Sequence, residues 1–159
     1  FHDGSAAYVY VANLIHSLSY QETHKLLKEI RRCLVPGGVL RIVELDVLEI
    51  IRQYVCQVNE LESRGETGLV LGQSPADKLA LRLGFRVPAA RHTFLRRYLG
   101  KSKMRRAWLW DAQSIKMYME SCGFVCSLKG ARDSRIPDID VVEQDPFLDT
   151  FSIEGEKHK

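Results

Sequence analysis

The 159-residue sequence lacks several features that would assign it to a class at once. It has no run of about 18 apolar residues, the length that a membrane-spanning helix needs. It shows no charged leader followed by an apolar stretch, so we expect no signal peptide. No G-x-G, Walker loop, metal-ligand spacing or Ser/His/Asp triad stands out, so the sequence predicts no metal site. The first methionine is Met104, and we expect the sequence to be part of a longer product.

Cysteine is scarce, and its spacing argues against a disulfide framework or a zinc site. None of the four cysteines forms a C-x-x-C pair. Cys33, Cys56 and Cys122 fall on the apolar faces of predicted helices, where a free thiol behaves as a small hydrophobic group. We therefore expect a reduced protein of the cytoplasm, with a reactive thiol as the alternative.

The net charge of +3 hides an uneven distribution. Residues 78–110 contain ten basic and no acidic residues, whereas the rest of the chain has 13 basic and 20 acidic residues. Aromatic residues lie between the basic ones, which argues against simple disorder. Three interpretations stay open, favoured in this order: a basic segment that docks on the acidic remainder, a site for an anionic small-molecule substrate, and a nucleic-acid surface.

Apolar runs predict a sheet. Stretches rich in Val, Ile, Leu and Phe predict four strands, at 6–12, 39–45, 124–128 and 150–155. Because helical segments separate the first three strands, these strands are expected to be parallel, and the last pair to form an antiparallel hairpin. The fold class is therefore predicted to be α/β.

Helix signals lie between these strands. Ser19 with Glu22, and Asp46 with Glu49, have the spacing of capping boxes at two helix starts. Asp111 can cap a third helix, which buries an apolar stripe. Short helices are expected at 76–83 and 92–99, and loops at 65–75 and 134–146. We expect one domain over 1–159, made of a strand–helix–strand–helix part (1–64), a basic helical insertion (65–110), and a helix with the terminal hairpin (111–159).

Three stretches of the sequence occur in a characteristic order: FHDGSAAYVYV at 1–11, LVPGGVLRI at 34–42 and DAQSIKMYMESCGF at 111–124. Together they resemble the second half of class I S-adenosylmethionine-dependent methyltransferases, around the family's fourth, fifth and sixth strands. The loop SRIPD at 134–138 and the last strand are similar to a bacterial subgroup with few assigned substrates. The resemblance covers essentially the whole chain and implies a partial Rossmann-like methyltransferase sheet.

The resemblance implies S-adenosylmethionine as cofactor. The family holds it with a Gly-rich loop after its first strand and an acid after its second, and this chain has neither. Pro36-Gly37-Gly38 follows a helix and precedes a strand, so we interpret it as a structural turn. The cofactor-binding residues stay unknown, and we expect the chain to be inactive alone.

Ligands of doubly wound sheets bind beyond the carboxyl ends of the strands. His16, which follows strand 6–12, is a candidate general base, with an exposed loop histidine as the alternative. Asp46 follows the next strand, beside Glu44, and is the second catalytic candidate, although helix capping explains it as well. The candidates for substrate binding are Asn13, His92, Arg96, Arg97 and Tyr98. The last four lie in the basic insertion, where arginines could clamp an anion.

The sequence leaves three functional hypotheses. The first is a partial or degenerate S-adenosylmethionine-dependent methyltransferase with an unknown acceptor. The alternatives are a non-catalytic oligomeric remnant and an anion- or nucleic-acid-binding module. Strand 6–12 carries no Pro or Lys, and in the resembled fold it would have a neighbour on both sides. Its free edge therefore predicts a homodimer in which this strand pairs with its two-fold mate.

Overall fold

The computed structural model describes residues 1–65, 74–83, 108–143 and 149–158. The chain divides into two compact units, Phe1–Val47 with Ala107–Lys159, and Leu48–Arg106. The second unit contains nearly all of α2 (Val47–Arg64) and α3 (Pro75–Arg82). The helix that the sequence predicts at 92–99 lies outside the described residues.

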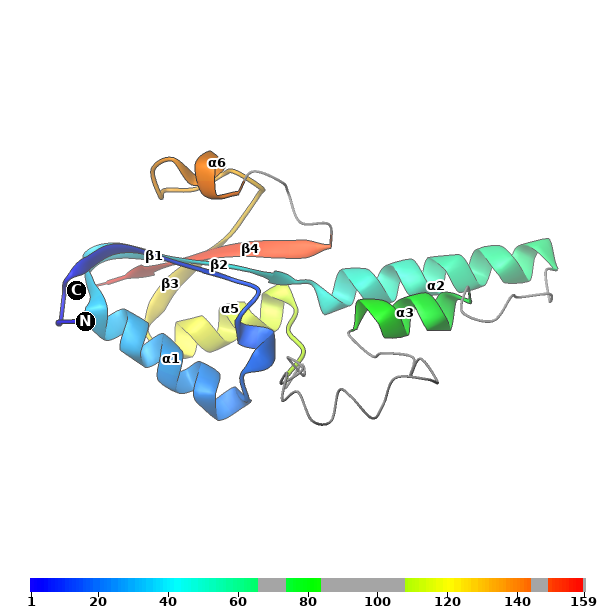
Figure 1. The fold of residues 1–159 in the computed structure, drawn as a ribbon, viewed down its shortest axis with the longest axis horizontal. Helices are drawn as coiled ribbons and strands as arrows, with labels where there is room; N and C mark the ends of the chain where they lie inside the picture. The colour runs from blue at the N-terminus through cyan, green and yellow to red at the C-terminus, as the bar shows by residue number, and fades with distance from the viewer. Residues whose placement is uncertain (66–73, 84–107, 144–148, 159) are drawn as a thin grey trace, which may run out of the picture. The chain divides into compact units, whose positions relative to one another are not determined.

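Four strands form one mixed sheet in the first unit, which confirms the predicted α/β fold class (Figure 1). They are β1 (Ala6–Ala12), β2 (Leu34–Leu45), β3 (Phe124–Lys129) and β4 (Thr150–Lys157). The order across the sheet is β1-β2-β4-β3. β1 and β2 are parallel, whereas β4 is antiparallel to both of its neighbours. The predicted antiparallel pair of the last two strands is therefore present.

Helices α1 (Tyr20–Cys33) and α5 (Ala112–Ser121) cover one face of this sheet (Figure 1). Both begin where the sequence predicts, because Ser19 and Asp111 each form a capping box with the residue three positions later. Their apolar stripes meet the sheet in a single core, which includes Leu27, Ile42, Ile115, Met119 and Ile153. Burial of these side chains orients the sheet and fixes which strand residues point away from the helices.

The other face of the sheet is polar and is covered by the chain around α6 (Ile139–Val142) (Figure 1). A row of side chains crosses it in register: Tyr10 on β1, Arg41 on β2 and Glu154 on β4. Arg41 is fully buried, and its guanidinium donates to both carboxylate oxygens of Glu143, at 2.7 and 2.9 Å. It also donates to the carbonyl of Asp133 at 2.9 Å. This pairing is what makes a buried charge tolerable.

The prediction of a plain loop at 134–146 is wrong because α6 lies within it. Its two prolines and polar composition indicated a loop, but Ile139 is buried and anchors a short helical turn. Glu143 N–H closes that turn on the Ile139 carbonyl at 2.7 Å. Tertiary contacts, including the Arg41–Glu143 pair, therefore outweigh the local preference.

The Pro-Gly-Gly turn differs from its prediction in one respect: β2 begins at Leu34, ahead of the turn, and not at Val39. Ala6 pairs with Leu34 and Tyr8 with Val39, so the four residues 35–38 bulge out of the strand. Gly37 has a positive φ of 78°, as the turn interpretation requires. The bulge is structural and forms no phosphate cradle.

The expectation that Cys56 lies on a buried helix face is wrong. Cys56 and Ile51, both on α2, are exposed, and among the described residues of α2 only Ile50 is buried. An apolar stripe on a helix predicts burial only where a partner element covers it.

None of the described helices is long and apolar enough to cross a membrane.

Candidate functional site

The carboxyl ends of β1 and β2 lie side by side because the two strands are parallel neighbours. Asn13, directly after β1, has a positive φ of 49°, and its N–H donates to the Val43 carbonyl of β2 at 3.0 Å. The chain then turns through η1 (Ile15–Ser17), which carries His16. Asp46 follows β2, and its N–H donates to the Asp149 carbonyl. The structure thus brings three predicted site residues to one end of the sheet.

His16 forms a close pair with Glu44, the next-to-last residue of β2. The distance from His16 Nδ1 to Glu44 Oε1 is 2.9 Å, and the side chains are 12% and 1% exposed. The backbone N–H of His16 donates to the other carboxylate oxygen at 3.3 Å, and Leu45 N–H donates to Oε1 at 3.0 Å. Glu44 is therefore held from several sides, and it orients the imidazole.

This geometry assigns the roles of the two ring nitrogens. A carboxylate only accepts hydrogen bonds, so Nδ1 carries the proton that it donates to Glu44. Nε2 of the neutral ring is then left as an acceptor, available to take a proton from a bound molecule. A histidine backed by a buried carboxylate is the arrangement that a general base requires.

An aromatic cluster stands beside this pair. The backbone N–H of Trp108 donates to the His16 carbonyl at 3.2 Å. The ring of Tyr20, at the start of α1, has its centroid 5.8 Å from Trp108 and 4.3 Å from Tyr118. Trp110 stacks on Tyr118 with centroids 5.5 Å apart. Trp110 is therefore buried in the core, whereas Trp108 is half exposed.

Tyr118 links the aromatic cluster to the start of α1 by a hydrogen bond. Its hydroxyl donates to the backbone carbonyl of Tyr20 at 2.9 Å. Burial, together with this bond, raises the pKa of Tyr118 to about 12. The phenol therefore stays protonated at neutral pH and serves as a permanent donor to the first turn of α1.

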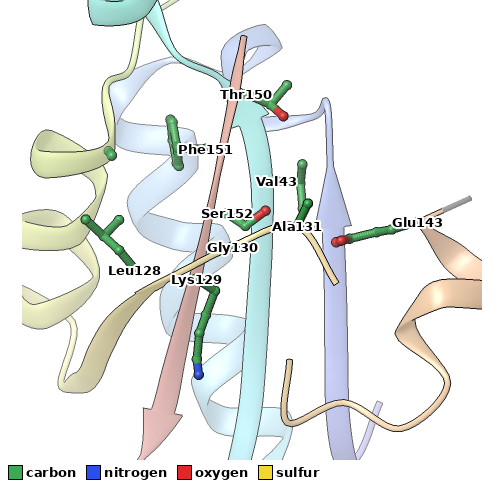
Figure 2. A pocket seen from close by; sticks show the side chains of 10 residues that line it. Val43, Leu128, Lys129, Gly130, Ala131, Glu143, Thr150, Phe151 and Ser152 are labelled. Carbon is green, nitrogen blue, oxygen red and sulfur yellow. The ribbon is translucent and has the colours of Figure 1, made fainter. Parts of the chain in front are cut away.

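A pocket of about 310 Å³ is lined by residues of β2, β3 and β4 and by Glu143 (Figure 2). Apolar walls come from Val43, Leu128 and Phe151, and Figure 2 shows the Glu143 carboxylate on the side opposite Leu128. Both carboxylate oxygens of Glu143 are bound to Arg41. That carboxylate therefore ties the segment after α6 to β2. Within the described part of the chain, we find a histidine placed to accept a proton only at the strand ends.

Several sequence candidates are not placed by the structure or are placed elsewhere than at the site. His92, Arg96, Arg97 and Tyr98 lie outside the described residues, so their role in substrate binding stays a prediction.

Burial raises the pKa of the Cys122 thiol, and that of Cys126 to about 12, so both are protonated at neutral pH and not activated as nucleophiles. Within the described ranges, no group of three His, Cys, Asp or Glu side chains could hold a metal ion.

Sequence reasoning missed the strongest contact of the site. Glu44 was noted at the end of its strand, but its pairing with His16 was not predicted, because the two residues are 28 positions apart. The signal was present: Glu44 interrupts an apolar strand, and a buried carboxylate needs a partner. The loop that follows the neighbouring strand β1 lies at that edge and carries His16.

No family model and no curated protein matches the chain. Solved structures do match. A S-adenosylmethionine-dependent methyltransferase from Methanosarcina mazei is 18% identical with a TM-score of 0.51, over 99% of this chain and 62% of that one. A candidate methyltransferase in complex with the Trm112 methyltransferase activator, from Haloferax volcanii, is 13% identical with a TM-score of 0.50, over 100% and 57%. A possible exported protein from Bordetella parapertussis is 13% identical with a TM-score of 0.53, over 99% and 41%.

The chain therefore spans less than two thirds of the length of these similar structures. At such low identity the likeness speaks for the fold alone. The strand order, the parallel β1–β2 pair and the antiparallel β4 agree with it. The chain has a class I methyltransferase-like α/β fold.

Proposed function

We propose that this chain is the acceptor-binding part of a S-adenosylmethionine-dependent methyltransferase, in which His16 removes a proton from the acceptor. The observation that carries the proposal is the His16–Glu44 pair at the carboxyl ends of β1 and β2. In an open α/β sheet this edge is where ligands bind. The methyltransferase-like fold agrees with that chemistry.

The residues of the chain act on the acceptor. An acceptor hydroxyl or amine within hydrogen-bond reach of His16 Nε2 gives up its proton to the ring, and Glu44 stabilises the resulting imidazolium through Nδ1–H. Asn13 lies at the same edge and can orient the acceptor by hydrogen bonds. Asp46 is a second polar group there, and Arg96 with Arg97 are proposed to hold an anionic group of the acceptor.

The cofactor supplies the methyl group, but the described residues do not form its complete binding site. The sequence has no G-x-G, and its one glycine pair lies in the bulge of β2. A Cβ built on Gly38 would lie 2.9 Å from the Val35 carbonyl oxygen and 3.1 Å from that of Ala7. Protein backbone thus fills the space beside Gly38 and leaves no room there for the cofactor. We propose that the chain is partial or degenerate.

A second candidate follows from the same misfit. A chain without a cofactor loop could serve as a non-catalytic oligomeric remnant or as a module that binds anions or nucleic acid through its basic segment. Salt-dependent binding to RNA or DNA would support the nucleic-acid version.

The test is turnover at high cofactor concentration. The 159-residue chain is incubated with millimolar S-adenosylmethionine and a panel of phenols, alcohols and amines, and S-adenosylhomocysteine is measured by mass spectrometry. The chain alone is expected to be inactive at ordinary cofactor concentrations, but millimolar cofactor offsets weak binding. Under that condition we expect slow product formation, which His16→Gln lowers by about 10²–10⁴-fold, the usual contribution of a general base. Glu44→Gln is expected to lower it less, because Nε2 is still present.

His24→Gln is the matched control, since His24 lies on α1 and contacts Cys122 instead of Glu44. It should leave product formation unchanged. Thermal unfolding of each variant checks that the fold is intact. Equal product from the wild type and His16→Gln, or no product at any cofactor concentration, would overturn the catalytic proposal in favour of the remnant.

A further inference from the structure

The chain has only two tryptophans, and both lie at the proposed acceptor edge. Trp110 is 3% exposed and belongs to the core, whereas Trp108 and Tyr20 are each 47% exposed. The rings of Trp108 and Tyr20 are tilted by 53°, and Tyr20 lies 20° from parallel with Trp110 at 6.3 Å. Two large aromatic side chains are thus half open to solvent while resting on buried ones. We call Tyr20, Trp108 and Trp110 the aromatic platform.

The platform is positioned relative to His16 by the backbone. Trp108 N–H donates to the His16 carbonyl, and Trp110 accepts from the N–H of Val47 through its own carbonyl, each at 3.2 Å. Tyr20 is the first residue of α1, which Ser19 caps, and its carbonyl accepts from the Tyr118 hydroxyl. These bonds hold the two exposed rings beside the histidine before any ligand arrives.

An unpartnered polar atom provides an independent sign. The indole N–H of Trp110 is buried and has no acceptor among the described residues. Buried donors almost always have a partner, and each exception calls for an explanation. An oxygen of a bound molecule or an ordered water would satisfy it.

Exposed apolar side chains extend the platform. Leu14, which precedes η1, and Leu109, between the two tryptophans, are both exposed. Exposed apolar side chains near an acid–base pair suit a small-molecule site, which combines apolar walls with a few polar groups. Flat rings prefer to stack on Trp and Tyr, so the shape of this surface selects planar ligands.

We propose that the acceptor is a planar aromatic compound with a ring hydroxyl, bound on Trp108 and Tyr20 so that the hydroxyl faces His16. This deepens the proposed function and rests on it. The chemistry of the base agrees with a phenol. The pKa of a phenol is near 10, which is much closer to the pKa of histidine than the pKa of an aliphatic alcohol is. Stacking would hold the ring, and Nε2 would take the phenolic proton.

The two tryptophans also make the test direct, because the protein has only two indole N–H signals in a ¹⁵N-edited NMR spectrum. The probe is p-cresol, and 4-methylcyclohexanol is its saturated counterpart of similar size. We expect millimolar p-cresol to shift both indole signals and 4-methylcyclohexanol to shift neither. Trp108→Phe assigns the signals and should bind p-cresol nearly as well as the wild type.

Trp108→Leu keeps an apolar side chain but loses the ring, and it should weaken p-cresol binding by about tenfold. Met117→Leu, at an exposed position of α5, is the matched control and should bind as the wild type does. A dispersed Trp110 signal in each variant shows that the core has folded. Equal binding of both probes, or no shift with p-cresol, overturns the inference.

The two proposals can fail separately. Binding of p-cresol is measured without cofactor and without turnover, so it can succeed even where no methyl transfer is found. Conversely, product formation that depends on His16 but favours aliphatic acceptors, with unmoved indole signals, would retain the methyltransferase and remove the aromatic acceptor.

Discussion

Arg41 is the residue on which the polar face of the sheet depends. Its guanidinium is fully buried, and it binds Glu143, the carbonyls of Gly130 and Asp133, and at 3.5 Å the carboxylate of Glu154. The two carboxylates are buried as well. Arg135, which is partly exposed, pairs with Glu154 at 3.5 Å as well, so Arg41 is shared between two carboxylates while Glu143 depends on Arg41 for compensation.

Replacement of this arginine should therefore be costly. We predict that Arg41→Met lowers the free energy of unfolding by about 3–5 kcal/mol, because it leaves Glu143 buried without its cation and removes one of the two arginines that pair with Glu154. Arg52→Met is the matched control, since Arg52 is exposed and pairs with Glu49 at 3.8 Å. It should change stability by less than about 1 kcal/mol. Urea unfolding measures both, and similar losses would show that the buried network is not the cause.

The same network predicts acid sensitivity. Burial acts to raise the pKa of Glu143, but the bonds and the charge of Arg41 outweigh it, so its net pKa lies below the ordinary 4.5. A depressed carboxyl pKa stabilises the fold at pH values above 4.5, and that stability is lost as the pH falls through the folded pKa. Glu143→Gln should be less stable than the wild type at pH 7. Its melting temperature should then fall less between pH 5 and pH 3, in the same buffer series.

At the scale of elements, the bulge at residues 35–38 lies near the start of β2 and sets its register with β1. Gly37 supplies the positive φ, while Gly38 allows the backbones of β1 and β2 to approach closely. We predict that Gly38→Ala destabilises the protein by about 1–3 kcal/mol, because its Cβ would meet two backbone carbonyl oxygens that cannot move freely.

Gly130→Ala is the control for this prediction, because the nearest atom to its Cβ would be 3.9 Å away and its φ is not positive. Thermal unfolding of the two variants should differ clearly. A Gly130→Ala loss as large as that of Gly38→Ala would mean that flexibility, and not close approach, explains the bulge glycine.

Elements with local signals could be predicted from the sequence, and those that depend on distant contacts could not. The capping boxes at Ser19 and Asp111 are read within four residues, and both helices begin there. By contrast, α6 depends on the burial of Ile139, and the start of β2 depends on the pairing of Leu34 with Ala6. In both cases the contacts come from segments that are distant in the sequence.

The candidate site follows the same division. His16, Asn13 and Asp46 were found because parallel strands deliver their following loops to one edge. The partner of His16 and the neighbours of Trp108 were not, since both come from chain segments far apart in the sequence. Residue types alone indicate what a site can do, whereas pairing between segments decides which residues act together.

At the scale of the whole molecule, the sheet has the strands of a methyltransferase-like fold but not the loop that holds its cofactor. We predict that the 159-residue chain shows no tight binding of S-adenosylmethionine, because the sequence contains no G-x-G that could form a Gly-rich cofactor loop after a strand. Isothermal titration calorimetry measures this. A dissociation constant in the low micromolar range would contradict it and would point to a cofactor site of a different kind.

The free edge of β1 leads to the last prediction. β1 is the outer strand of the described sheet and pairs only with β2 there. It has no charged residue and no proline, and Tyr8 on it is exposed. Unpaired N–H and C=O groups on an apolar strand form a template for another strand. We predict a homodimer in which two copies of β1 pair as antiparallel neighbours, because a two-fold axis makes that contact self-complementary.

Light scattering of the chain at micromolar concentration measures the mass, with a dimer expected. Tyr8→Lys should shift the equilibrium toward monomer, since a charge on an edge strand opposes pairing and would face its own copy across the two-fold axis. Met117→Lys places the same charge on an exposed position of α5 and should leave the dimer intact. A wild-type monomer, or equal dissociation by both variants, would show that β1 is not the contact, whatever the state of the methyl-transfer site.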